Sequence, residues 1–145
     1  MHMRVLASFI ICFIFVFPIK ISFADEFVML KNNKVNVRYG PSFEYPIKYV
    51  YLKKNLPIKV IDKMENFRRI IDHKHNSGWI HTSQLKKSTS VILNKKHYIF
   101  SKPLAIAEKG KLIMLGKCKK NWCKISNKEI SGWILFNGFW GQLPN

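Results

Sequence analysis

Acidic side chains are scarce in this chain. Its 145 residues include 8 Asp and Glu against 25 Lys and Arg, which gives a formal net charge of +17. None of the acids, and no serine, stands at a spacing that suggests paired catalytic carboxylates or an activated nucleophile. The sequence therefore contains no motif for acid–base or covalent catalysis, and we expect that the protein is not an enzyme.

Cysteine and histidine are too few and too scattered to indicate a metal site. The three cysteines are Cys12, Cys118 and Cys123. A structural zinc site needs four converging ligands at set spacing. His73 and His75 would share one face of a strand, but no cysteine stands near them in the sequence. We interpret these histidines as solvated loop residues and expect no metal and no cofactor.

Long apolar runs are missing except at the N-terminus. Between Val5 and Phe17 every residue but one is apolar, and this run is shorter than the roughly 20 residues that span a bilayer. Pro18 ends the run, and Lys20 follows it closely. A spanning helix would have to bury that lysine. The alternative, an uncleaved membrane anchor, is therefore disfavoured against a secretory signal peptide.

The small residues Ser22 and Ala24 fit the −3 and −1 positions that signal peptidase requires. We predict a signal peptide over residues 1–24, cleaved after Ala24, and hence a periplasmic or secreted protein with no integral membrane span in its mature form. Removal of Arg4 and Lys20 with the signal peptide lowers the formal charge from +17 to +15.

The remaining positive charge has two interpretations. Export argues against nucleic acid as a partner, although a strongly basic chain often binds it. The lysines are scattered, and Lys, Asn and Ile are used heavily throughout, as in a coding sequence rich in A and T. The other interpretation is attraction to anionic cell-wall polymer, acidic lipid headgroups or an acidic partner protein.

An internal repeat indicates two similar units in the mature chain. Three blocks recur in the same order with nearly the same spacing, namely Ile58–Ile61 with Leu112–Leu115, Phe67–Ile70 with Trp122–Ile125, and Ser77–Ile80 with Ser131–Ile134. We therefore predict a first unit at residues 25–87 and a degenerate second unit at residues 88–145.

Each unit has the pattern of short strands and turns, and no window has a helical stripe of apolar residues. In the first unit the expected strands are 27–30, 35–38, 58–60, 67–71 and 79–81, and a long loop follows Gly40. Several short strands in about 60 residues need closure, which favours a small barrel. The predicted fold class is all-β, with two small β-barrels in tandem.

The motifs Asn36–Ser42 and Gly78–His81 resemble the opening and the closing segments of the bacterial SH3-like (SH3b) family. The resemblance extends over residues 27–85, and one departure is Phe67, where the family usually has Trp. A second, degenerate copy covers residues 91–141. The resemblance implies two SH3-like barrels and a recognition module that binds cell-wall peptide or partner proteins in various relatives.

Cys118 and Cys123 flank a predicted hairpin. A hairpin can bring the two Cα atoms within disulfide range, and an oxidising compartment would then close the bond. The alternative is two separate buried thiols on opposite faces.

Aromatic residues cluster around the loop of the first unit, where flat faces with polar tips would suit an extended peptide or a sugar–peptide ligand. The candidate ligand-binding residues are Tyr39, Phe43, Tyr45, Tyr49, Tyr51 and Pro57. The alternative is that alternate tyrosines pack the barrel and the rest are ordinary surface. Trp79 and Trp133, which repeat at the same point of each unit, are expected to fill the barrels.

The sequence thus favours an exported, non-catalytic SH3-like binding protein that recognises peptidoglycan or another envelope component. The alternative is a periplasmic or secreted adaptor that binds peptide segments of a partner protein. Both hypotheses need the same aromatic surface, so the sequence does not separate them.

Overall fold

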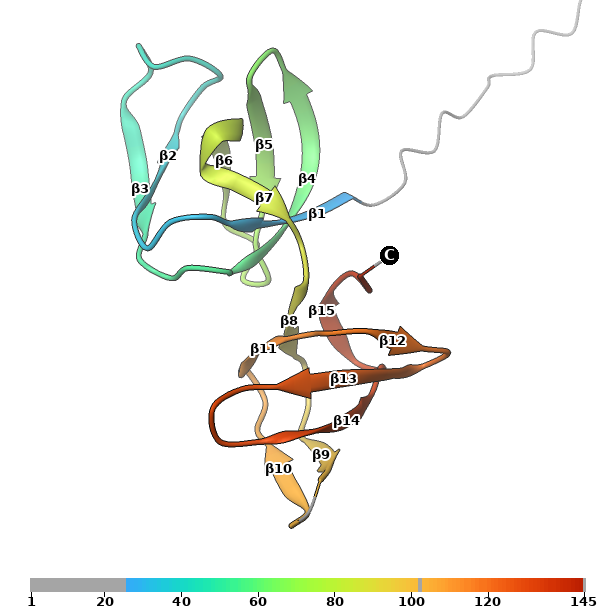
Figure 1. The fold of residues 1–145 in the computed structure, drawn as a ribbon. Coiled ribbons are helices and arrows are strands. Elements are labelled where there is room, and N and C mark those ends of the chain that lie inside the picture. The colour runs from blue at the N-terminus through green and yellow to red at the C-terminus, as the bar shows by residue number, and fades with distance from the viewer. Residues whose placement is uncertain (1–25, 102, 145) are drawn as a thin grey trace, which may run out of the picture.

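The computed structural model describes residues 26–101 and 103–144, which fold almost entirely as β-structure (Figure 1). The all-β prediction is confirmed. The predicted signal peptide lies outside the described residues. Within residues 26–101 and 103–144, no helix is long and apolar enough to cross a membrane.

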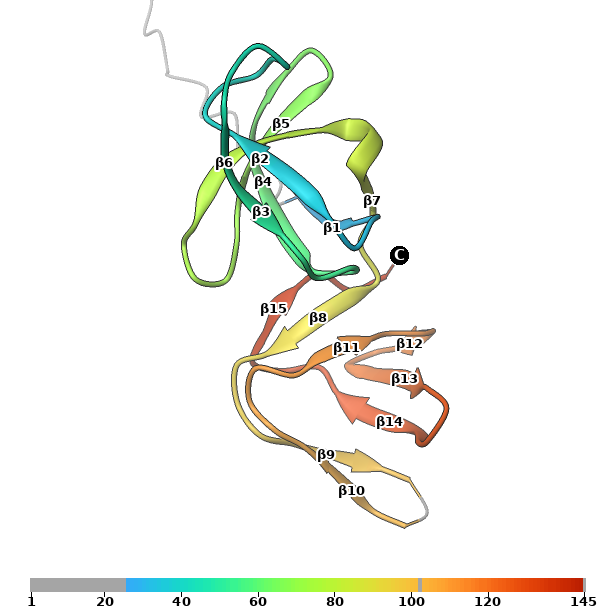
Figure 2. The same cartoon turned by 90° about the vertical axis from the view of Figure 1, so that its left-hand side faces the viewer.

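The first unit, residues 26–87, forms one seven-stranded antiparallel sheet in the order β3-β2-β6-β5-β4-β1-β7 (Figure 2). Its elements are β1 (Glu26–Leu30), β2 (Val35–Arg38), β3 (Ile47–Tyr51), β4 (Pro57–Met64), β5 (Phe67–Ile71), β6 (Ser77–His81), the 3₁₀ turn η1 (Thr82–Gln84) and β7 (Leu85–Lys87). The expected strands are present, and β3 lies where the sequence predicted a long loop.

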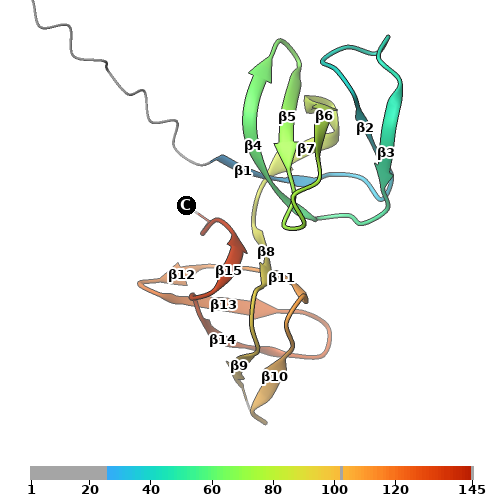
Figure 3. The ribbon, with the colours of Figure 1, turned by 180° about the vertical axis from the view of Figure 1, so that it is seen from behind.

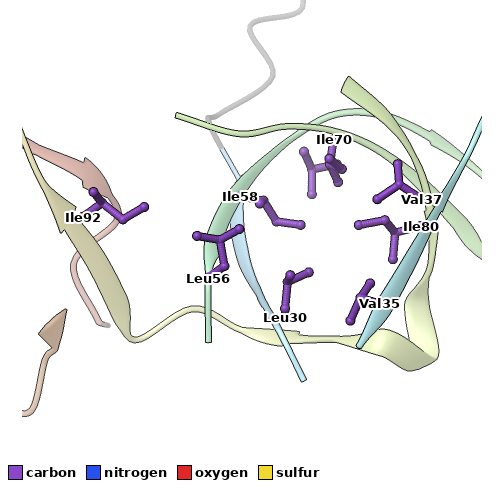
Figure 4. Packing of buried hydrophobic residues seen from close by; sticks show 9 residues of the cluster. Leu30, Val35, Val37, Leu56, Ile58, Ile70, Ile80 and Ile92 are labelled. Carbon is purple, nitrogen blue, oxygen red and sulfur yellow. The ribbon is translucent and has the colours of Figure 1, made fainter. Parts of the chain in front are cut away.

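Alternating apolar residues on these strands point into one core, as the period of a half-buried strand requires. Val35 and Val37 on β2 are fully buried, and so are Ile58 on β4 and Ile80 on β6. Figure 4 shows these side chains converging from opposite sides of the bent sheet. The curvature of the sheet, aided by a bulge in β4, lets one sheet surround its own core.

The prediction of closed barrels is wrong. The sheet of the first unit begins at β3 and ends at β7, and these two strands do not pair. β7 is three residues long and pairs only with β1, while β3 pairs only with β2. The sheet therefore wraps the core through side-chain packing without a continuous hydrogen-bonded ring.

The second unit, residues 88–144, contains two sheets, in the orders β10-β9-β14-β13-β12 and β11-β8-β15. Their strands are β8 (Ser90–Leu93), β9 (His97–Phe100), β10 (Ala105–Ala107), β11 (Leu112–Met114), β12 (Cys118–Lys119), β13 (Trp122–Ser126), β14 (Ser131–Leu135) and β15 (Phe139–Gly141). Here too the ends of the sheets do not pair, so no closed barrel forms.

The strand order of the first unit recurs in the second. The strands β8, β9, β10, β14 and β15 take the places of β1, β2, β3, β6 and β7, and β13 takes that of β5. The long β4 corresponds to two shorter strands, since β11 pairs with β8 and β12 pairs with β13. The break between β11 and β12 is what divides the second unit into two sheets.

The two units pack directly against each other (Figure 3). Ile92 on β8 joins the buried core of the first unit. Trp140 on β15 packs beside it, donates its indole N–H to the carbonyl of Pro57 at 3.2 Å, and meets the ring of Phe27 edge-on at 5.4 Å. Ser90 Oγ donates to the carbonyl of Asn55 at 2.6 Å. These contacts hold β8 and β15 against one end of the first unit.

Candidate functional site

The loop between β2 and β3 carries three exposed aromatic side chains of the first unit. Tyr39 and Phe43 are each 62% exposed, and Tyr45 is 47% exposed. Large aromatic side chains that stay in water after folding are candidates for ligand contact, because a ligand would remove their apolar surface from water. These three are half of the predicted ligand-binding set.

Phe43 folds back over two residues of the sheet. Its ring centroid lies 5.3 Å from that of Phe67 on β5 and 5.0 Å from that of His81 on β6, and the last two rings are 5.1 Å apart. Phe67 and His81 are direct cross-strand partners. The three rings form a continuous aromatic cluster in which Phe67 is buried and Phe43 faces solvent.

Arg38 fixes the loop that presents these rings. Its guanidinium Nη1 donates to the carbonyls of Phe43 at 3.1 Å and Tyr45 at 2.7 Å, and the cation lies 5.4 Å from the centroid of the Phe43 ring. The Tyr45 ring packs so closely on Gly40 that any Cβ there would meet it at 2.5 Å. The Asn-Val-Arg-Tyr-Gly motif therefore builds a preformed loop, which lowers the entropic cost of binding.

Tyr49 and Tyr51 do not belong to this exposed surface. Both lie on β3, pack against the core, and meet edge-on with their rings 5.2 Å apart. Tyr51 Oη donates to a carboxylate oxygen of Asp72 at 2.9 Å. Burial raises the pKa values of both tyrosines. Their hydroxyls therefore stay protonated and serve the packing of the β3 edge.

Asp72 organises the turn between β5 and β6. Burial acts to raise the pKa of this carboxyl, but hydrogen bonds from the side chain and backbone of Asn76, from Tyr51 Oη and from the Lys74 amide outweigh it. The pKa of Asp72 therefore lies below its ordinary value. The buried carboxylate is charged, and both of its oxygens accept hydrogen bonds that hold the turn.

Pro57 is fully buried at the start of β4, and its carbonyl accepts the hydrogen bond of Trp140. The structure thus divides the predicted ligand-binding set. Tyr39, Phe43 and Tyr45 share one exposed loop, whereas Tyr49, Tyr51 and Pro57 contribute to packing.

The expectation that Trp79 and Trp133 fill the cores is wrong. In each Gly-Trp-Ile motif the glycine and the isoleucine point inward, so the tryptophan between them points outward. Trp79 is half-buried and Trp133 is 41% exposed. The inward position 78 is a glycine because β2 lies close to β6 there, and a Cβ would lie 2.4 Å from Val37 Cγ1.

Sequence reasoning overlooked Arg38, Phe67, Trp79 and His81 as neighbours of the exposed loop. Arg38 and Arg69 lie on either side of Trp79 in the strand register. The alternation along β5 and β6 could have identified them. Once Ile70 and Ile80 are assigned to the core, the period of two puts Phe67, Trp79 and His81 together on the outer face of the sheet.

The predicted disulfide is confirmed. Cys118 and Cys123 are directly opposite each other on β12 and β13, with their Cα atoms 4.0 Å apart. Cys123 points into the core of the second unit. Within residues 26–101 and 103–144, no group of three or more His, Cys, Asp or Glu side chains could hold a metal ion.

A pocket of about 210 Å³ lies in the second unit, between β10, β11 and the turn from β13 to β14. Most of its lining is aliphatic, including Ile99, Ile113 and Ile125, and Lys111 and Glu129 supply charges. The pocket shares no residue with the aromatic cluster of Phe43, Phe67 and His81.

Comparison with known proteins identifies the first unit. Residues 31–87 match the family model of the bacterial SH3 domain. The resemblance to the bacterial SH3 domain family that the two motifs predicted is therefore confirmed over residues 31–87. The match covers β2 to β7 and includes the Arg38 loop and the Gly-Trp-Ile segment.

Two solved structures show a weak likeness over both units. NlpC2 and NlpC1 from Trichomonas vaginalis are 14% and 12% identical to the chain, each with a TM-score of 0.39. The likeness covers 82% and 83% of this chain and 49% and 48% of those chains, so this chain spans about half of their length. No curated protein matches the chain.

Proposed function

We propose that the protein is an exported, non-catalytic binding protein whose first unit recognises peptidoglycan or a related envelope component. The match to the bacterial SH3 domain family supports a role in cell-wall binding. In this proposal the second unit is a degenerate SH3-like module in tandem with the first, and the protein works in the periplasm or after secretion.

The observation that carries the proposal is the preformed aromatic loop of the first unit. Arg38 ties the loop by two hydrogen bonds, and the loop holds Phe43 and Tyr45 at the surface. Lys48 lies 5.6 Å from the ring centroid of Tyr39, which adds a positive charge beside an aromatic face. Such a surface suits an extended ligand that combines peptide or sugar with carboxylate groups.

The test is binding of the mature protein to purified peptidoglycan at low and at high salt. We expect binding at low salt, weaker binding at high salt because part of the attraction is electrostatic, and about a tenfold loss in Phe43→Ser, which removes an exposed anchor. Tyr98→Ser is the matched control, because Tyr98 is 55% exposed but lies on the second unit.

Absence of binding at low salt, or equal losses in the two variants, would contradict recognition of the wall by the first unit. If crosslinking in the native cell instead captures one envelope protein through the Phe43 loop, and peptidoglycan does not bind, the adaptor function replaces it.

A further inference from the structure

The second unit has an exposed aromatic face of its own, on the sheet β10-β9-β14-β13-β12. We define the aromatic face as Tyr98, Phe100, Ile106, Trp122 and Trp133. Ile106 is the direct cross-strand partner of Tyr98, and Trp133 is that of Phe100. The Phe100 and Trp122 rings meet edge-on at 5.2 Å. Four strands therefore contribute to one continuous face.

These side chains remain in contact with solvent to an unusual degree. Tyr98, Phe100 and Ile106 are each at least 50% exposed, Trp133 is 41% exposed and Trp122 is 37% exposed. Folding already buries the alternate residues Ile99, Cys123 and Ile134 on the inner side of the same strands. The outer face is not needed for the core. A contiguous apolar surface of this kind marks an interaction site.

The charge around this face selects an anionic partner. Lys124 is the cross-strand partner of Trp133, and Lys119 is that of Trp122. Both lysines are exposed. In the sequence from residue 88 to residue 145, ten lysines stand against Glu108 and Glu129 alone, and Glu108 already lies 3.7 Å from Lys96. The disulfide fixes the hairpin that carries Lys119 and Trp122.

The apolar members favour lipid over sugar as the partner. A sugar ring stacks on aromatic rings, but Ile106, and Leu104 beside it at 58% exposure, offer only aliphatic surface. Aliphatic side chains gain most by transfer into hydrocarbon, while Trp and Tyr prefer the headgroup region. The β9–β10 hairpin also lies at the end of the second unit that is remote from the first (Figures 1 and 3), which leaves it free to meet a flat surface.

We propose that this aromatic face docks on the surface of an anionic phospholipid bilayer. Leu104, Phe100 and Ile106 enter the outer acyl region, Trp122 and Trp133 lie at the headgroups, and Lys119 and Lys124 pair with lipid phosphates. Aromatic anchors and basic residues are the two components that interfacial binding combines. This site is distinct from the wall-binding loop of the first unit and goes beyond the proposed function.

The experiment is co-sedimentation of the mature protein with vesicles of phosphatidylcholine, with and without phosphatidylglycerol. We expect binding only to the vesicles that contain phosphatidylglycerol, with tryptophan emission shifted to shorter wavelength. The double variant Phe100→Ser, Trp133→Ser should bind at least about tenfold more weakly, because it loses two apolar anchors. Lys124→Glu, which leaves every apolar anchor in place, should also bind more weakly. Leu52→Ser on the first unit, at a residue that is 78% exposed and belongs to neither site, is the matched control and should bind as the unchanged protein does.

Three outcomes would overturn the proposal. The first is no binding to phosphatidylglycerol vesicles. The second is binding that the double variant retains, since this would be adsorption by charge alone. The third is a double variant that loses peptidoglycan instead of vesicles, which would make a glycan the occupant of the face. Unfolding in urea, compared among the variants, separates loss of binding from loss of folding.

Discussion

The outer faces of the two units share one backbone register and yet present different surfaces. In the first unit Arg38 stands opposite the outward tryptophan, Trp79, and in the second Phe100 stands opposite Trp133. Arg38 ties down a loop whose Phe43 lies over Phe67, and Phe67 is only 5% exposed. In the first unit, then, an arginine on β2 holds a loop in place, and Phe43 of that loop covers Phe67 on the outer face of the sheet.

Among residues 88–101 and 103–144 of the second unit, no loop with an arginine at the Arg38 position covers the outer face of the sheet, since Phe100 stands at that position. Trp122 holds the strand position that Phe67 holds in the first unit, because each begins the strand that pairs with the Gly-Trp-Ile strand. Trp122 nevertheless remains 37% exposed. Sheets with corresponding strand orders thus keep the same inner face through packing, while the connections between strands decide how much of the outer face stays in water.

The largest expected effect tests the assignment of inner and outer faces. Ile80→Ala and Ile134→Ala each remove a fully buried side chain, and each should lower the free energy of unfolding by about 2–5 kcal/mol. The neighbouring changes Trp79→Ala and Trp133→Ala should cost less, because these rings already contact solvent. Urea denaturation of the four variants measures this, and a tryptophan variant that is less stable than its isoleucine neighbour would refute the assignment.

Acid should affect the two units at different pH. The pKa of Asp72 in the first unit lies below its ordinary value of 3.8, so its contribution is complete above about pH 4 and is lost as pH falls through the lowered folded-state pKa. In the second unit, burial first and then Lys95 lower the pKa of His97 below 6.5, against an opposing backbone hydrogen bond with Gly138. Neutral His97 therefore contributes its full stabilisation above about pH 6.5, and this contribution is lost as pH falls from there through the lowered folded-state pKa.

Asp72→Ala isolates the first of these effects. It leaves the donors of Asn76, Lys74 and Tyr51 without their buried acceptor, which should cost about 2–3 kcal/mol at neutral pH. Amide resonances of the two units, followed during a pH titration, would report each unit separately. Unfolding of the first unit already above about pH 5 would contradict the role given to this carboxylate. So would an Asp72→Ala variant in which the pH midpoint of acid unfolding of the first unit is unchanged.

The smallest effect is expected from reduction of the disulfide. Cys118 and Cys123 close a ring of only six residues, so reduction should lower the free energy of unfolding by no more than about 2 kcal/mol. The loss should be confined to the second unit. Thermal unfolding with and without a reductant tests this, with Cys118→Ser, Cys123→Ser as the comparison. Destabilisation of the first unit would show that the hairpin supports more than its own strands.

Much of the fold could be predicted from local patterns. Alternation identified the strands that carry Val35, Val37 and Ile58. The repeated Gly-Trp-Ile marked two strands, β6 and β14, that hold corresponding places in the strand orders. The strand β3 was missed because Gly-Pro-Ser and Tyr-Pro precede it and suggest a loop. The open sheets were also missed, because closure depends on whether the edge strands β3 and β7 meet, which no local pattern encodes.

The candidate site was only half predictable. The six predicted residues are close to one loop in the sequence. Pro57, however, contacts Trp140, which is 83 residues further along the chain. Tyr49 and Tyr51 pack against the core, and Tyr51 donates a hydrogen bond to Asp72. Exposure depends on which distant segment covers a side chain. Tyr39 and Tyr45 are exposed, whereas Tyr49 and Tyr51 are half-buried, although all four lie within 13 residues of the sequence.

By itself the sequence determined the β-rich class, the bacterial SH3 motifs and the cysteine pair, because each rests on neighbours along the chain or on a short hairpin. Tertiary structure alone decided that Trp79 and Trp133 point outward, that Arg38 fixes the loop between β2 and β3, and that the second unit leaves an aromatic face in water. These features depend on strand register and on long-range packing, in which a shift of one residue exchanges the core face for the solvent face.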